Sequence, residues 1–139
     1  MSMPMLDTYP DRINIDRVQL AGAIDALLAC AATCTACADA CLSEQMVGEL
    51  TKCVRTNLDC ADICDTTARV LSRHTGYDAN ISRAQLAAAA MVSGSCADEC
   101  LRHQRMEHCR ICAEVCRAAE RASQDLLASM ERHRANVHK

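Results

Sequence analysis

Aromatic side chains are almost absent from this sequence, which has no Trp, no Phe and two Tyr among 139 residues. The interior must therefore be built from Ala, Leu, Ile, Val, Met and Cys, which make a core of small and sulfur-containing side chains. The alternating apolar pattern of β-strands is missing as well. These absences favour one helical domain, which also suits a chain of this length.

An excess of positive charge is also missing. The net charge is -3 and the pI is about 5.9, so the chain has no excess of basic residues with which to bind nucleic acid or an acidic membrane. The longest apolar runs, such as Leu86 to Val92, are too short to span a bilayer. The segment from Met1 to Tyr9 resembles no export signal. We therefore expect a cytoplasmic protein with reduced cysteines and no nucleic-acid or membrane partner.

Cysteine is the residue that the chain has in excess. It has twelve, and most neighbours are three, four or seven positions apart, which is the spacing of side chains on one face of a helix. Twelve thiols exceed what a core needs, because Ala or Leu would fill the space without the risk of oxidation. The pattern indicates a binding surface for soft metal ions. The candidate ligands are Cys30, Cys34, Cys37, Cys41, Cys53, Cys60, Cys64, Cys96, Cys100, Cys109, Cys112 and Cys116.

Helical spacing disfavours disulfide bonds between these thiols. Residues three or four positions apart on a helix have Cβ atoms about 5 to 6 Å apart, whereas a disulfide needs about 3.8 Å. Two thiolates on opposite sides of one ion lie about 4.5 Å apart when each metal–sulfur bond is about 2.3 Å. Pairs such as Cys30 and Cys34 are therefore spaced for a bridging ion.

Helix-breaking and capping residues divide the chain into an arm, four helices and a tail. Pro4 and Pro10 predict an irregular N-terminal arm over residues 1–15, and Asp16 is the expected N-cap of the first helix. The bundle is expected over residues 16–134 and the C-terminal tail over 135–139. The first two helices should cover about 16–42 and 46–74, and the last two should begin near positions 82 and 106.

Each helical segment carries one column of apolar, sulfur and small polar residues at heptad spacing. Four such columns predict an all-α fold, an antiparallel four-helix bundle with a cysteine-lined core and a short N-terminal arm. The columns are Leu20, Ala23, Leu27, Cys30, Cys34, Cys37, Cys41; Met46, Leu50, Cys53, Asn57, Cys60, Cys64, Thr67, Leu71; Ser82, Leu86, Ala89, Ser93, Cys96, Cys100, His103; and Met106, Cys109, Cys112, Cys116, Ala119, Ser123, Leu126, Met130.

The two short helix connections, after the first and third helices, should lie at the same end of such a bundle. Counted from that end, the cysteines occupy one half of the core, and Cys30, Cys60 and Cys64 are the deepest. The other half is expected to be an apolar plug of Leu27, Leu71, Leu86 and Leu126. Metal should therefore enter at the open mouth, where the sequence places Met46, Met106, His103 and His108.

Charge balance decides which soft metal fits. Cys34-x2-Cys37 and Cys109-x2-Cys112 look like zinc half-sites, but zinc knuckles need turns and these pairs lie within helices. Four thiolates around a divalent ion also leave two negative charges, and the columns contain no Lys or Arg to offset them. Thiolates that bridge monovalent Cu(I) approach neutrality at about one ion per cysteine. Multiple Cu(I) ions per chain are therefore expected.

The C-x3-C-x2-C-x3-C pattern from Cys30 to Cys41, and the His108–Cys109 pair that opens the last helix, resemble the bacterial copper storage proteins. This family consists of cysteine-rich four-helix bundles, and the resemblance covers about residues 16–132. It implies a core filled with Cu(I) bound by cysteine pairs, often tetrameric assembly, and His or Met residues where metal enters. It further implies the cytosolic branch of the family.

Two histidines complete the set of candidate ligands. His103 continues the column of Cys96 and Cys100, and His108 is included because of the family resemblance. Met46 and Met106 are interpreted as core residues, although thioethers at the mouth would suit transient capture of Cu(I).

Three polar residues stand in the columns where further thiols could have stood, so the capacity of this chain is expected to be lower than that of the family's cytosolic branch. They are Asn57, Thr67 and Ser93. We interpret Asn57 and Ser93 as hydrogen-bonded polar groups of the core, because buried polar side chains are normally paired.

Storage and sequestration of Cu(I), without catalysis, is the function that these observations favour. One alternative is a thiol- or metal-dependent redox or detoxifying enzyme, but a di-metal bundle needs inward glutamates, and Glu99 and the other glutamates fall outside the columns. The second alternative is a copper metallochaperone, which needs only one exposed site. The expected partners are copper ions, with protein copper donors or acceptors possible, and further copies of the chain.

Overall fold

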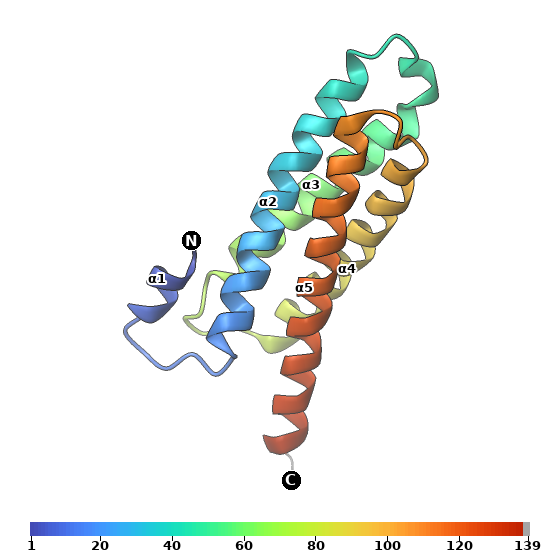
Figure 1. The fold of residues 1–139 in the computed structure, drawn as a ribbon. Helices are drawn as coiled ribbons and strands as arrows, with labels where there is room; N and C mark the ends of the chain where they lie inside the picture. The colour runs from blue at the N-terminus through green and yellow to red at the C-terminus, as the bar shows by residue number, and fades with distance from the viewer. Residues whose placement is uncertain (138–139) are drawn as a thin grey trace.

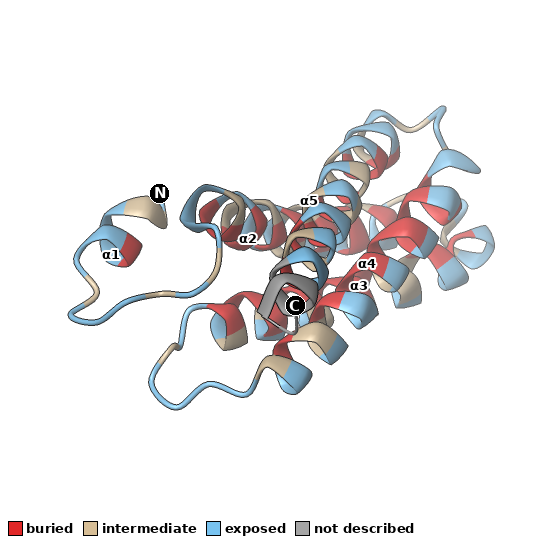
Figure 2. Cartoon of the chain, turned by 90° about the horizontal axis from the view of Figure 1, so that it is seen from below, coloured by how far each residue is buried: buried red, intermediate tan, exposed pale blue. Residues whose placement is uncertain are grey.

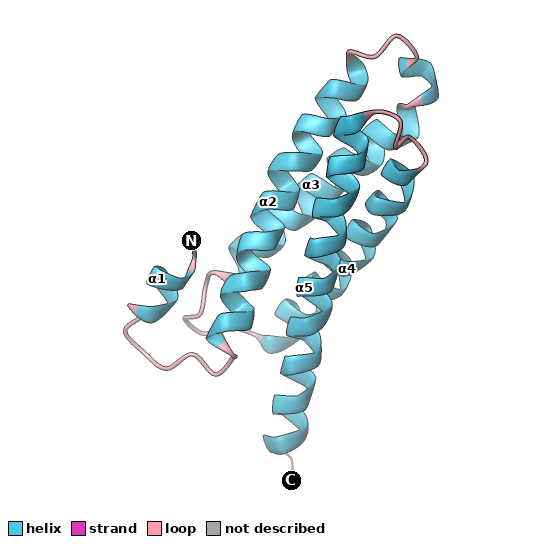
Figure 3. Cartoon of the chain, in the orientation of Figure 1, coloured by secondary structure: helices cyan, strands magenta, loops and turns pink. Residues whose placement is uncertain are grey.

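The protein is helical throughout the described residues in a computed structural model, which describes the backbone of residues 1–137 and the side chains of residues 1–132. Four long helices form the body of the molecule, and short loops join them at its two ends (Figures 1 and 3). The elements in chain order are α1 (Met3–Asp7), α2 (Arg17–Leu42), the 3-10 helix η1 (Val47–Glu49), α3 (Thr51–Leu71), α4 (Ala79–Leu101) and α5 (Glu107–Val137).

The four long helices pack in a ring, in which each one lies against two neighbours. The packed pairs are α2 with α3, α3 with α4, α4 with α5, and α5 with α2. Consecutive helices run in opposite directions, so the α2–α3 and α4–α5 connections meet at one end of the molecule (Figure 1). The prediction of an antiparallel four-helix bundle is confirmed.

The heptad columns form the core of this bundle. Every column residue from Leu20 to Cys41 on α2 is buried, and the same holds on α3 from Leu50 to Leu71. Figure 2 shows that buried residues follow the inner faces of the helices while the outer faces are exposed. The exceptions lie at the mouth, where Met46 precedes α3 and is 46% exposed, and where His103 and Met106 are partly exposed. Heptad periodicity therefore located the core correctly.

Helix ends follow from the capping residues. The side chain of Asp16 accepts hydrogen bonds from the backbone N–H groups of Val18 and Gln19, as predicted for the N-cap of the first helix. Asp78 caps α4 by accepting from Asn80 N, so this helix begins at Ala79, earlier than predicted. The predicted second helix is divided into η1 and α3.

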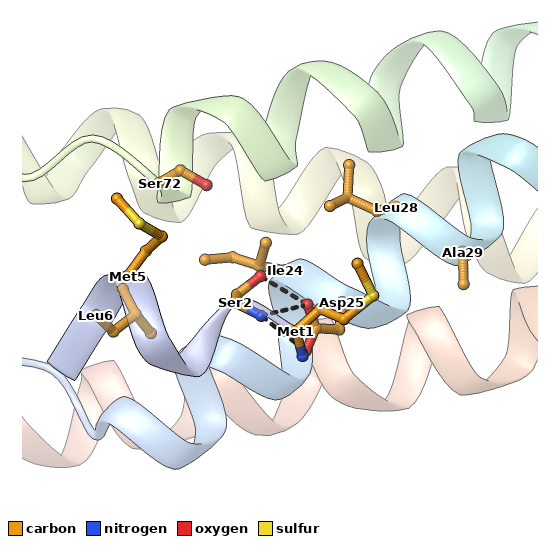
Figure 4. A pocket seen from close by; sticks show the side chains of 9 residues that line it. All are labelled: Met1, Ser2, Met5, Leu6, Ile24, Asp25, Leu28, Ala29 and Ser72. Atoms are coloured by element: carbon orange, nitrogen blue, oxygen red, sulfur yellow. Dashed lines mark hydrogen bonds and ion pairs between the residues drawn. The ribbon is translucent and has the colours of Figure 1, made fainter. Parts of the chain in front are cut away.

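The N-terminal arm is not irregular throughout, so that part of the prediction was wrong. It contains α1, because a proline is tolerated in the first turn of a helix, where its missing N–H costs no hydrogen bond. Leu6 is buried, and the backbone N–H and hydroxyl of Ser2 both donate to Asp25 on α2. The arm thus docks on α2 beside a pocket of about 630 Å³ (Figure 4).

The C-terminal helix continues past the predicted end of the bundle at residue 134, because α5 extends to Val137. Residues 138–139, the rest of the predicted tail, lie outside the described residues. The division into arm, bundle and tail stays a prediction.

Among the described residues, α2 is the one helix that is long and apolar enough to cross a membrane by length and composition. A core helix of a bundle passes the same test, and α2 packs against α3 and α5. Its buried side chains include Leu20, Leu27 and four cysteines. The apolar character of α2 is therefore accounted for by its place in the core.

Candidate metal centre

All twelve cysteines are buried and free of disulfide bonds. They come from all four long helices and line the half of the core that is nearer to the α2–α3 and α4–α5 connections. Contacting sulfur atoms lie between 3.5 Å apart, for Cys34 and Cys116, and 3.9 Å apart, for Cys34 and Cys96. The predicted convergence of the thiols on one interior surface is confirmed.

Four thiols make the innermost cluster, which we call the deep group: Cys30, Cys34, Cys60 and Cys116. Cys30 Sγ lies 3.7 Å from the sulfurs of both Cys60 and Cys116. Cys64 extends the group, since its sulfur lies 3.8 Å from Cys60 Sγ. A second set of four shares two of these thiols and adds Cys96 and Cys112. Neighbouring sets thus form a continuous network of sulfur atoms.

The cluster nearest to the α2–α3 and α4–α5 connections, which we call the mouth group, combines three thiols with an imidazole: Cys37, Cys41, His108 and Cys109. His108 Nδ1 lies 3.5 Å from Cys37 Sγ and 3.5 Å from Cys109 Sγ. The other ring nitrogen, Nε2, lies 3.1 Å from Glu44 Oε1. The structure therefore brings His108, a candidate ligand by family resemblance, among three thiols.

Asn57 occupies the centre of the thiol network and is fully buried. Its Nδ2 donates to the carbonyl oxygen of Cys53 at 2.8 Å, and its Oδ1 accepts from the thiol of Cys112 at 3.0 Å. The hydroxyl of Ser93 similarly lies 3.5 Å from Cys64 Sγ. Both polar residues are hydrogen-bonded within the core, as predicted.

His103 is placed differently from His108. Its Nε2 lies 3.0 Å from Glu99 Oε2, and within the described part of the chain it belongs to none of the sets of close ligand atoms. Glu99 lies outside the heptad columns but is only 6% exposed, because its carboxylate lies between His103 and Lys52. The spacing of four positions between Glu99 and His103 was the signal that could have revealed this pair.

The sulfur distances suit soft metal coordination after small adjustments. Three thiolates around one ion, each bonded at about 2.3 Å, lie about 4.0 Å apart, and two on opposite sides lie about 4.5 Å apart. The contacts in the network are slightly shorter, at 3.5 to 3.9 Å. Small rotamer changes would therefore admit ions between thiols without moving the helices.

Hydrogen bonds between thiols divide the cysteines into two kinds. Hydrogen bonds with Cys116 and Cys34 lower the pKa of Cys30 to about 5, and hydrogen bonds with Cys100 and Cys37 lower the pKa of Cys53 to about 3. The pKa of Cys34 is raised, mainly by its hydrogen bonds with Cys112 and Cys116. Because the thiols titrate as a coupled set, some are predisposed to bind metal as thiolates while their neighbours keep protons.

Positive side chains are missing from the core. The buried polar residues among those that the structure describes include no Lys or Arg; they are Asn57, Thr67, Ser82, Ser93, Glu99 and Ser123. Excess thiolate charge would therefore have to be balanced by the metal ions themselves. Monovalent ions balance bridging thiolates at about one ion per sulfur, so the site fits Cu(I) better than a divalent metal.

A helical bundle with a continuous, buried network of reduced thiols defines a protein that binds several soft metal ions. The sequence profile of the copper storage protein family matches residues 16–128. The chain belongs to this family, and the resemblance noted from the sequence is confirmed.

Solved structures and one further relative agree with this assignment. The chain is similar to the copper storage protein Ccsp of Streptomyces lividans loaded with 10 copper equivalents, with 57% identity, a TM-score of 0.91, and coverage of 93% of this chain and 99% of that one. A five-copper structure of the cytosolic protein from S. lividans has 62% identity and a TM-score of 0.78 over 79% of this chain and 92% of that one. The uncharacterized cysteine-rich protein YhjQ of Bacillus subtilis strain 168 is 30% identical over 66% of this chain and 81% of its own length.

Proposed function

We propose that this protein stores and sequesters multiple Cu(I) ions, which the thiolates in the core of the bundle bind. The observation that carries the proposal is the continuous thiol network, in which each set of close ligand atoms shares members with another set. A network of this kind has room for many ions, whereas a metallochaperone would need one site and a di-metal bundle enzyme would need two ions. Membership in the copper storage protein family supports the same function.

We propose the twelve cysteines as the storage ligands, together with His103 and His108 at the mouth. The sulfur contacts described above support the cysteines, and the contacts of its Nδ1 with two thiols support His108. Support for His103 is limited to its place at the same end of the bundle, because its Nε2 is paired with Glu99. Its proposed role is to assist ions that enter.

Catalysis is not part of the proposed function. A di-metal bundle enzyme would place several carboxylates in its core, whereas Glu99 is the one buried acidic side chain among the described residues. A metallochaperone would present one exposed site, but the thiols of this chain are buried. The storage proposal accounts for all twelve cysteines, and neither alternative does.

The compartment and assembly are proposed by analogy. One similar solved protein is described as a cytosolic copper storage protein, and we propose that the present chain also acts in the cytoplasm. We further propose that it forms a homo-oligomer, a tetramer by family resemblance, and that it exchanges copper with donor or acceptor proteins. Light scattering on the purified protein, with and without copper, tests the assembly.

Anaerobic titration of the reduced protein with Cu(I), against a chromophoric chelator, tests the storage function. We expect on the order of one Cu(I) per cysteine at saturation, because each thiolate can bridge ions. Saturation at one or two ions would contradict storage and favour a chaperone.

A further inference from the structure

Each of the two histidines at the mouth is paired with a glutamate, but His108 alone faces a set of close thiols within the described residues. We infer that Glu44 is a positioning residue for His108, whose tautomer and ring orientation it fixes so that Nδ1 faces the thiols of the mouth group. This inference rests on the proposed function, because it concerns how the first thiols on the path of Cu(I) receive a third ligand.

The two ring nitrogens of His108 have different partners. Nε2 lies 3.1 Å from Glu44 Oε1, and an ionised carboxylate can only accept, so Nε2 must carry and donate the proton. A neutral imidazole has one N–H group, which leaves the lone pair on Nδ1. That atom lies 3.5 Å from Cys37 Sγ and from Cys109 Sγ. A carboxylate behind a ligating histidine orients the ring and increases its basicity in this way.

The local backbone keeps Glu44 within reach of His108. Glu44 follows the end of α2, and its N–H donates to the carbonyl oxygen of Cys41 at 3.2 Å. One short segment thus holds both a thiol of the mouth group and the carboxylate that orients the histidine of that group. The side chains of Glu44 and His108 are 32% and 28% exposed, so an incoming ion can reach the pair from solvent.

The second pair at the mouth shows that contact with glutamate alone does not make a ligand. His103 Nε2 lies 3.0 Å from Glu99 Oε2, much as in the first pair, but Glu99 also lies 3.8 Å from Lys52 Nζ and is buried. His103 has no thiol set beside it among the described residues. The Glu44–His108 pair therefore differs from the Glu99–His103 pair because the second ring nitrogen of His108 contacts thiols.

The test compares Glu44→Ala, Glu44→Gln and the control Glu49→Ala in the full-length reduced protein. Glu49 is exposed on η1, at the same connection, so its removal reports on loss of negative charge alone. Nitrogen-15 NMR of the histidines, without copper, identifies the protonated ring nitrogen. Stopped-flow transfer of Cu(I) from a chelator measures the loading rate, circular dichroism checks the fold, and titration gives the capacity.

We expect the wild-type protein to carry the proton of His108 on Nε2 and Glu44→Ala to lose this preference. Loading should slow about tenfold, the lower end of the usual effect of removing such a partner, while the final Cu(I) count stays unchanged. Glu44→Gln keeps an acceptor oxygen and should restore most of the rate, and Glu49→Ala should load like the wild type.

Two results would overturn the role of Glu44. One is a Glu44→Ala variant that keeps both the tautomer and the wild-type loading rate. The other is an equal slowing by Glu49→Ala, which would assign the effect to long-range attraction of the cation. A wild-type capacity of one or two ions would overturn the storage function instead, and the tautomer, which is measured without copper, would still decide whether Glu44 orients His108.

Discussion

Removing two of the deepest thiols, by Cys60→Ser together with Cys64→Ser, should lower the capacity for Cu(I) by about two ions, the ratio of one ion per thiolate. Cys60 Sγ lies 3.7 Å from Cys30 Sγ and 3.8 Å from Cys64 Sγ, so both losses fall at the inner end of the network. Hydroxyl groups do not replace thiolates as ligands for a soft ion. The remaining thiols keep their contacts with one another.

The double variant should still fold. The new hydroxyl at position 64 can bond with Ser93 Oγ, which lies 3.5 Å from the present sulfur, and an unsatisfied hydroxyl costs about 1 to 3 kcal/mol. A domain stable by about 5 to 15 kcal/mol tolerates this loss. Urea unfolding of the reduced protein measures the cost.

The assay is anaerobic titration with Cu(I) against a chromophoric chelator. It compares the double variant with a matched control, Thr67→Ser. Thr67 is buried on the same face of α3, one turn beyond Cys64, and its hydroxyl donates to Ile63 O, so its loss of a methyl group leaves all thiols in place. The control should keep the wild-type capacity. An unchanged capacity in the double variant, or a fall to almost none in a folded protein, would refute independent storage by each thiolate.

Three further predictions concern the fold, the mouth and protons. The reduced protein without metal should be helical by circular dichroism, and Leu27→Ala in the apolar plug should cost about 2 to 5 kcal/mol in urea unfolding with unchanged copper capacity; a random-coil spectrum would contradict the bundle. His103→Ala with His108→Ala should slow removal of copper by a chelator while the final count stays nearly unchanged; loss of most capacity at wild-type rates would contradict entrance at the mouth. Copper affinity should increase with pH, because binding must displace protons from thiols of raised pKa such as Cys34. An indicator dye should show that the first copper ions release fewer protons than later ones. Equal proton release throughout the titration would contradict preformed thiolates.

Heptad spacing was sufficient to predict the bundle and its core. The columns of small, apolar and sulfur residues allow one packing, in which four helices bury one face each. The N-cap at Asp16 was also predictable, because it depends on residues two and three positions away. Features that depend on residues close together in the sequence can therefore be predicted from it.

Contacts between distant segments were not predictable in the same way. Glu44 and His108 are 64 positions apart, and their pairing depends on how the α2–η1 connection packs against the start of α5. The hydrogen bond between Asn57 and Cys112 joins α3 to α5. To predict such pairs one must know how far each helix is shifted along its neighbour, and the heptad column of a single helix does not specify this shift.

One error and one feature that the sequence analysis did not predict have local physical causes. The arm contains α1 because Pro4 lies in the first turn, where proline is compatible with a helix, although proline breaks a helix at interior positions. Glu99 is buried although it lies outside the heptad column, because it pairs with His103 and Lys52 at the edge of the core. A charge that has a partner can enter a position that the apolar pattern leaves out.

The most direct test of copper storage in the core is a crystal structure of the reduced protein loaded with Cu(I), with anomalous scattering recorded at the copper edge. The account predicts several copper peaks along the bundle axis, between the sulfurs of the deep group and outward to His108 in the mouth group. Copper on the outer surface, or one peak with the remaining thiols unoccupied, would contradict it.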